Sequence, residues 1–170
     1  MIIIGEKING AIPSIKQAIA ERNEALIIER TLAQAAAGAN FLDCAPSTAT
    51  EIEYETMVWL IGLMQGATNV PLCIDSPNAK LLARVIEEGH LNKPGMVNSV
   101  NEEGDKCETI FPLVAGTPWE VVGLTCDQEG IPADPAKKVE IAKRIIDKAV
   151  KYGVALNQLH IDPCVMALAT

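Results

Sequence analysis

Short apolar runs that lead into a carboxylate or a carboxamide recur along this chain. Continuous apolar runs of this length are typical of buried parallel strands, and they occur six times. In chain order the polar residues that follow them are Glu6, Asp43, Asp75, Asn98, Asp127 and Asp162. In alternating β/α folds ligands bind beyond the carboxyl ends of the strands. The pattern therefore predicts a polar pocket built from strand ends.

Helical patterns separate the predicted strands. Gly38 is expected to end the second helix, and Asp134 to cap the last one ahead of Pro135. Residues 50–53 match a capping box, and Ser76 is the predicted N-cap before Pro77. The expected helices cover residues 13–20, 24–37, 50–65, a segment after Pro77, 102–115 and a segment after Pro135.

A strand followed by a helix, repeated along the chain, predicts a parallel sheet with right-handed crossovers. A doubly wound open sheet and a (β/α)₈ barrel both fit this order. The first turn, Gly5 to Gly10, has no GxGxxG, and its Glu6 would repel a pyrophosphate. Polar residues at nearly every strand end favour the barrel. We expect an α/β fold, a TIM (β/α)₈ barrel truncated to about six βα units, as one partial domain over residues 1–170 that lacks the last two units.

Charge and composition argue against several classes of ligand and partner. A net charge of −8 disfavours nucleic acid as a partner. No apolar stretch reaches membrane-spanning length and no signal peptide precedes the first strand, so we expect a cytoplasmic protein without a membrane partner. The five cysteines form no CxxC pair and the two histidines no HxH pair, so no bound metal is expected. The cysteines are interpreted as small buried hydrophobic residues of a reducing compartment.

The strand-end side chains suit a neutral heterocycle with several N–H donors. Carboxylates accept hydrogen bonds, and the amides of Asn9 and Asn98 both donate and accept. The guanidine-like edge of a pterin pairs with one carboxylate through two parallel bonds. A structural interpretation remains for two residues, because Asp43 could cap a turn before Pro46 and His160 could be a satisfied interior histidine.

Six motifs in register then carry a family resemblance. They are residues 3–10 (IIGEKING), 38–43 (GANFLD), 73–76 (CIDS), 97–99 (VNS), 123–125 (GLT) and 161–163 (IDP). Together they resemble the pterin-binding methyltransferases that move a methyl group between methyltetrahydrofolate and a corrinoid protein. The resemblance covers the whole chain.

The resemblance implies that Asp75, Asn98 and Asp162 hydrogen-bond the pterin ring, while Glu6, Asn9 and Asp43 line the same mouth. It implies transfer of the N5 methyl group to a cobalt(I) corrinoid on a partner protein, or the reverse. It assigns no certain catalytic residue; Asp162 and Asn98 are supporting. The family's activating asparagine ends a seventh strand, which lies beyond the expected six.

Three alternatives stay open. The chain could belong to a dihydropteroate synthase-like pterin enzyme, or it could be a non-catalytic folate-binding fragment. Exposed edge strands could also be completed by a second copy in a homo-oligomer. The sequence identifies neither the corrinoid partner nor the direction of methyl transfer.

Overall fold

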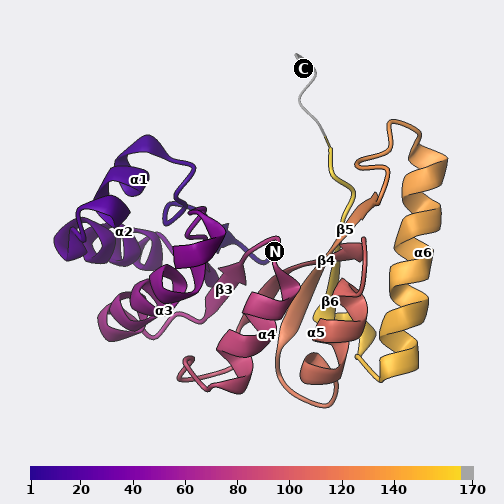
Figure 1. The fold of residues 1–170 in the computed structure, drawn as a ribbon. Helices are drawn as coiled ribbons and strands as arrows, with labels where there is room; N and C mark the ends of the chain where they lie inside the picture. Colours follow the sequence, from indigo (N-terminus) through magenta and orange to yellow (C-terminus); the bar gives the residue numbers. More distant parts are fainter. Residues whose placement is uncertain (166–170) are drawn as a thin grey trace. The chain divides into compact units, whose positions relative to one another are not determined.

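Strands and helices alternate along the described chain (Figure 1). The computed structural model describes residues 1–165. The chain divides into two units, Met1–Met96 and Val97–Thr170, and each is described by itself.

The first unit has three parallel strands in the order β1, β2, β3. They are β1 (Ile4–Gly5), β2 (Phe41–Cys44) and β3 (Leu72–Asp75), and four helices accompany them. The helices are α1 (Pro13–Ala20), α2 (Glu24–Ala36), α3 (Thr50–Ala67) and α4 (Ala79–Glu87). Aliphatic side chains such as Ile27, Leu42 and Leu60 are fully buried and form the core of this unit.

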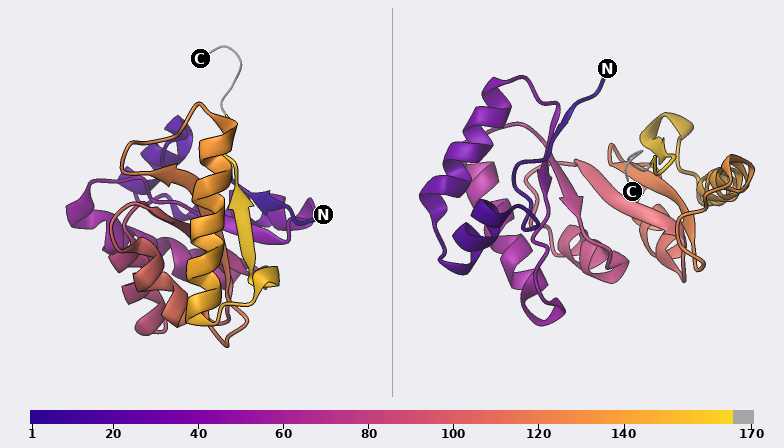
Figure 2. Two further views of the ribbon diagram at one scale, coloured as in Figure 1. Left: turned by 90° about the vertical axis from the view of Figure 1, so that its right-hand side faces the viewer. Right: turned by 90° about the horizontal axis from the view of Figure 1, so that it is seen from above.

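The second unit holds β5 (Glu120–Asp127) and β6 (Leu159–Asp162), which pair in parallel, and nearly all of β4 (Met96–Glu102). Its helices are α5 (Lys106–Val114), α6 (Pro135–Tyr152) and a short 3₁₀ helix, η1 (Leu156–Gln158). Helix α6 lies along β5 and β6, as Figure 2 shows. Its buried stripe includes Ile141, Ile145 and Ala149, at the spacing expected of a helix packed on a sheet.

Most predicted helix bounds are confirmed. Helix α1 covers the predicted residues, and α2 ends at Ala36 with Gly38 at a φ of 88° behind it. Asp134 caps α6 by accepting a hydrogen bond from the Ala136 amide at 2.9 Å. Helix α5 begins at Lys106 rather than at residue 102, because the buried residues Val100 and Asn101 continue β4.

Two predicted caps are wrong. The N-cap of α3 is Ala49, so residues 50–53 form no capping box, and Glu53 is buried instead. Asn78 caps α4 by accepting a hydrogen bond from the Leu81 amide at 3.2 Å. Ser76 is not the cap, because its hydroxyl donates to Glu53 and accepts from the Asn78 amide.

Within residues 1–165, no helix combines the length and the apolar character needed to span a membrane.

The loop after β1 is hydrogen-bonded to the residue that follows β2. Gly10 donates its amide to the Ala45 carbonyl at 2.9 Å, and Ala45 donates to the Ile8 carbonyl at 3.1 Å. A Cβ atom on Gly10 would lie 2.0 Å from the Pro46 carbonyl oxygen, so this contact requires glycine. The close approach fixes where Asn9 stands beside the end of β2.

Replacing Gly10 with alanine is expected to lower the free energy of unfolding by about 2–4 kcal/mol, because the backbone must move to admit the methyl group. Urea unfolding of Gly10→Ala measures the loss. Gly62→Ala is the matched control: nothing lies within 4 Å of its new methyl group inside α3. It should be neutral or stabilising by up to about 1 kcal/mol. Equal effects of the two changes would contradict the close contact at Gly10.

Candidate functional site

The strand register of the first unit places three predicted site residues on one face of its sheet. Gly5 lies opposite Leu42, and Asp43 lies opposite Cys73. Continued by one residue beyond Gly5, the same register brings Glu6 beside Asp43, and the charge of Glu6 acts on both Asp43 and Asp75. Because side chains alternate along a strand, Asp75 points to the same side as Cys73. Glu6, Asp43 and Asp75 therefore share this face at the carboxyl ends of β1, β2 and β3.

Asp43 is buried, with only 2% of its surface exposed. Its Oδ1 atom has no hydrogen-bond partner within residues 1–165, so this oxygen does not cap a turn. Burial, and after it the charges of Asp75 and Glu6, raise the pKa of Asp43 to about 8, against the lowering effect of a hydrogen bond from the Cys73 thiol. At neutral pH this carboxyl group is mostly protonated, so it can donate a hydrogen bond to a ligand.

Asp75 is half-buried at the end of β3. Burial, and after it the neighbouring charges of Glu6 and Glu53, raise its pKa to about 6. Asp75 is therefore mainly ionised at pH 7, while Asp43 is mainly neutral. The cluster thus offers a ligand both an acceptor and a donor carboxyl group.

Glu53 belongs to this cluster of carboxyl groups, although the sequence predicts it as part of a capping box at residues 50–53. It is 6% exposed, and its Oε1 accepts a hydrogen bond of 2.6 Å from the Ser76 hydroxyl. The periodicity of α3 could have revealed its burial, because Glu53 shares a helix face with Met57 and Leu60. Glu53 links α3 to the end of β3 and holds a negative charge close to Asp75.

The loop residue Asn9 is held in place by its own turn. Its Oδ1 accepts hydrogen bonds from the Ala11 amide at 2.8 Å and from the Ser47 hydroxyl at 3.3 Å. A backbone bridge joins Asn9 to Ala45 at the end of β2. Glu6 is exposed. The first unit therefore brings together four of the six predicted residues: Glu6, Asn9, Asp43 and Asp75.

The other two predicted residues lie in the second unit. Asp162 ends β6 opposite Leu124 of β5, is exposed, and accepts a hydrogen bond from the Cys164 amide at 2.7 Å. Its neighbour Ile161 points to the side of Gly123 that packs on Ile145 of α6, so Asp162 points to the opposite face. Asn98 is half-buried within β4.

His160 is a satisfied histidine. Its Nε2 lies 2.5 Å from Oε2 of Glu120, a half-buried partner at the start of β5. This contact accounts for His160 without a catalytic role.

The cysteines agree in part with the sequence interpretation. Cys44, Cys73 and Cys107 are buried, whereas Cys126 and Cys164 are partly exposed, and all five are free. Within residues 1–165, no group of three or more histidine, cysteine and acidic side chains is arranged to hold a metal ion.

Comparison with known proteins shows which family the chain belongs to. The sequence profile described as pterin binding enzyme matches residues 12–170. The chain belongs to the pterin-binding enzyme family. The resemblance expected from the six motifs is therefore confirmed.

Two curated relatives match over the whole chain. A methylcorrinoid:tetrahydrofolate methyltransferase of Eubacterium limosum is 49% identical over 172 residues, which cover 100% of this chain and 63% of that protein. A methionine synthase of Mycobacterium tuberculosis is 30% identical over 177 residues, covering 100% of this chain and 15% of the enzyme. The chain thus spans less than two thirds of these relatives.

Solved structures confirm the fold class. The dihydropteroate synthase of Xanthomonas albilineans in complex with 7,8-dihydropteroate aligns with a TM-score of 0.65 at 20% identity, over 96% of this chain and 58% of that one. A dihydropteroate synthase of Burkholderia cenocepacia aligns with a TM-score of 0.63 at 17% identity, over 95% and 56%. At this identity the likeness shows the fold alone, which is that of a partial TIM barrel.

The pH dependence of stability tests the buried carboxyl group of Asp43. Its pKa is about 8 in the folded chain against an ordinary value of 3.8. Between these values the folded state keeps a proton that the unfolded state has lost. The free energy of unfolding should therefore fall with rising pH, by at most about 1.4 kcal/mol per pH unit. Asp75 adds to the slope between 3.8 and about 6.

The Asp43→Asn variant removes this titration. Its stability should match that of the wild type near pH 4 and exceed it at pH 8, as measured by urea unfolding across that range. The control is Asp147→Asn, which changes an exposed carboxylate on α6. A wild-type profile that runs parallel to that of Asp43→Asn would show that folding does not raise the pKa of Asp43.

Proposed function

We propose that the protein containing this chain is a methyltransferase that binds a tetrahydrofolate and exchanges a methyl group with a corrinoid protein. The observation that carries the proposal is the pair of carboxyl groups at adjacent strand ends of a pterin-binding family member, Asp43 buried and Asp75 half-buried, both with a raised pKa. The 49% identity to the Eubacterium limosum enzyme supports the corrinoid as the second reactant.

The carboxyl cluster suits the pterin ring. An ionised Asp75 can accept two parallel hydrogen bonds from the amino group and ring N–H of the guanidine-like edge. A protonated Asp43 can donate to a ring nitrogen or carbonyl, which an ionised carboxylate cannot do. We assign Asn98 and Asp162 to the same ring on the strength of the family resemblance, with Glu6 and Asn9 as further contacts at the mouth.

We propose that the methyl group moves from the methylcorrinoid to tetrahydrofolate, the order given in the name of the Eubacterium limosum relative. The corrinoid, carried by its partner protein, would supply the methyl group and keep the electron pair of the cobalt–carbon bond. N5 of the folate attacks the methyl group with its lone pair and must release its proton. Ionised carboxylates at the mouth are suitable acceptors for that proton.

We place residues 1–170 in one pterin-binding barrel domain of a cytoplasmic enzyme that associates as a homo-oligomer. A dihydropteroate synthase activity is less well supported, because the solved synthases share only about a fifth of their residues with this chain. A non-catalytic folate-binding role would appear as folate binding without methyl transfer to or from the corrinoid protein.

Substitution of Asp75 tests the proposed pterin site. Asp75→Asn should weaken methyltetrahydrofolate binding about 10- to 100-fold, because an amide cannot accept the bidentate pair. Isothermal titration calorimetry on the full-length protein measures the loss. The exposed carboxylate of Asp147 again gives the control, and Asp147→Asn should bind normally. Absence of folate binding to the wild type, or unchanged binding to Asp75→Asn, would refute the assignment.

A further inference from the structure

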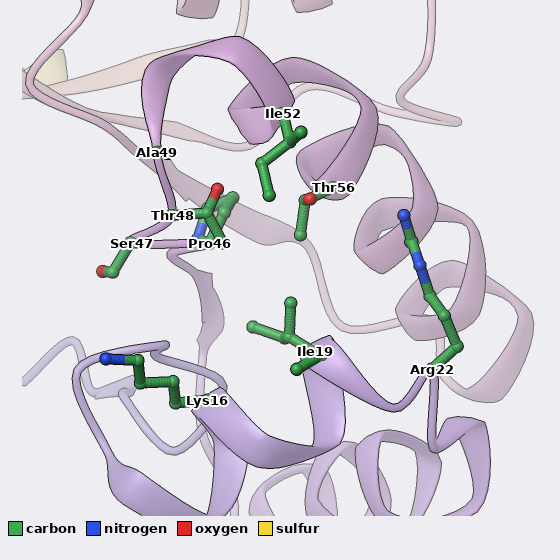
Figure 3. A pocket seen from close by; sticks show the side chains of 10 residues that line it. Lys16, Ile19, Arg22, Pro46, Ser47, Thr48, Ala49, Ile52 and Thr56 are labelled. Atoms are coloured by element: carbon green, nitrogen blue, oxygen red, sulfur yellow. The ribbon is translucent and has the colours of Figure 1, made fainter.

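A hollow of about 410 Å³ lies within the first unit, between α1 and the start of α3 (Figure 3). We call it the α1–α3 hollow. Its walls come from α1, Arg22, the loop that follows β2, and the first turns of α3. Its volume falls in the range of small-molecule sites. It contains none of the six residues assigned above to the pterin.

The hollow is apolar between two cationic sides. In Figure 3, Ile19, Pro46 and Ile52 lie between the Lys16 and Arg22 side chains. Among residues 1–165, Lys16 and Arg22 are its only charged lining residues, and both are exposed. Neither has a carboxylate partner within the part of the chain that the structure describes. Although the chain carries a net charge of −8, the local field of this hollow favours an anion.

Two further features prepare the hollow for a ligand. The Arg22 guanidinium stacks over the Trp59 ring at 4.5 Å from its centroid, which restrains the cation. Thr48 Oγ1 is buried and has no hydrogen-bond partner within residues 1–165. Buried hydroxyl groups are normally paired, so a rotation of Thr48 that brings this hydroxyl to a ligand acceptor would remove a cost.

Carboxylates of the neighbouring helix do not cancel this charge. Glu51 and Glu53 belong to the first turn of α3, but neither lines the hollow. Glu53 is turned toward Ser76, to which it is hydrogen-bonded at 2.6 Å.

The hollow borders the proposed folate site within the same unit. Ser47, on its rim, donates a hydrogen bond of 3.3 Å to Oδ1 of Asn9. Asn9 is bridged in turn to Ala45, two residues beyond Asp43. A ligand that extends from the strand ends past Asn9 therefore meets the hollow.

We propose that the α1–α3 hollow binds the aminobenzoyl-glutamate tail of the folate. The benzoyl ring lies on the apolar floor, and the glutamate carboxylates pair with Lys16 and Arg22. This inference rests on the proposed function, and it adds a specificity site for the carboxylate-bearing tail. Additional γ-linked glutamates bring further carboxylates to the same two cations.

Ligands with and without the tail separate this site from the pterin site. The probes are methyltetrahydrofolate, its triglutamate, and a methyltetrahydropterin that ends before the benzoyl group. Calorimetry on the full-length protein should give affinities that rise from the pterin to the folate to the triglutamate. Lys16→Gln and Arg22→Gln should each weaken the binding of both folates about five- to tenfold. Methyltetrahydropterin binding should change by less than about twofold.

Two further variants act as controls. Lys143→Gln makes the same charge change on the exposed face of α6 and should leave all three affinities unaltered. Ala20→Leu narrows the hollow without any charge change and should weaken folate binding but not pterin binding. Because Arg22→Gln also removes the contact with Trp59, circular dichroism on each variant checks that it is folded.

Each outcome decides one of the two proposals. Equal affinity for the pterin and the folates in the wild type, or equal losses for both in Lys16→Gln, would overturn the assignment of the hollow. If the wild type binds no methyltetrahydropterin, the proposed function fails. Aminobenzoyl-triglutamate alone then tests the hollow, and binding that Lys16→Gln weakens would keep it as a site for aromatic carboxylates.

Discussion

Burial of like charges on one sheet face is the constraint on which this site depends. Asp43 and Asp75 end adjacent parallel strands. Burial is the main cause that raises the pKa of each, and the charge of Asp75 adds to the rise at Asp43. Two buried carboxylates in such a position cannot both be ionised cheaply, so one keeps its proton near neutral pH. The ligand proposed for these strand ends is a pterin, whose edge presents donors and acceptors side by side. A site with one acceptor carboxylate and one donor carboxyl group matches that mixed edge. Burial of these groups lowers the free energy of unfolding, but it also holds their hydrogen-bonding atoms in place for the ligand.

The second requirement is that the carboxyl groups stay aligned. The close backbone contact between Gly10 and Pro46 holds the first loop on the end of β2. Two hydrogen bonds act with it, from the Gly10 amide to the Ala45 carbonyl and from the Ala45 amide to the Ile8 carbonyl. The bond from Ser76 to Glu53 ties the end of β3 to α3. Neither interaction touches the proposed pterin edge directly. Both limit the movement of side chains whose pKa values depend on their mutual distance.

Features decided by local geometry could be predicted from the sequence. Gly38 adopts the left-handed conformation that ends α2, and Asp134 caps α6 ahead of its proline. The predicted caps at residues 50–53 and Ser76 were wrong because both patterns describe isolated helices. In the folded chain the burial of Glu53 brings it to the Ser76 hydroxyl, and Asn78 caps α4 in its place. Tertiary packing decides which residue caps α4, and no local sequence motif predicts it.

The same distinction explains why the sequence showed the carboxyl cluster but not the hollow beside it. Strand ends repeat along the chain and therefore form a visible series, whereas Lys16, Arg22 and Thr48 stand on unrelated segments with no common pattern. What these residues share is their position, because all three line the α1–α3 hollow. Ser47, on the rim of this hollow, is hydrogen-bonded to Asn9. A heterocycle is recognised by paired donors and acceptors, which the negative cluster supplies at the strand ends. A carboxylate tail is repelled by that cluster and needs cations at some distance from it. Placing the cations behind Asn9, outside the acidic face, lets one unit attract both ends of a ligand whose ends differ in charge.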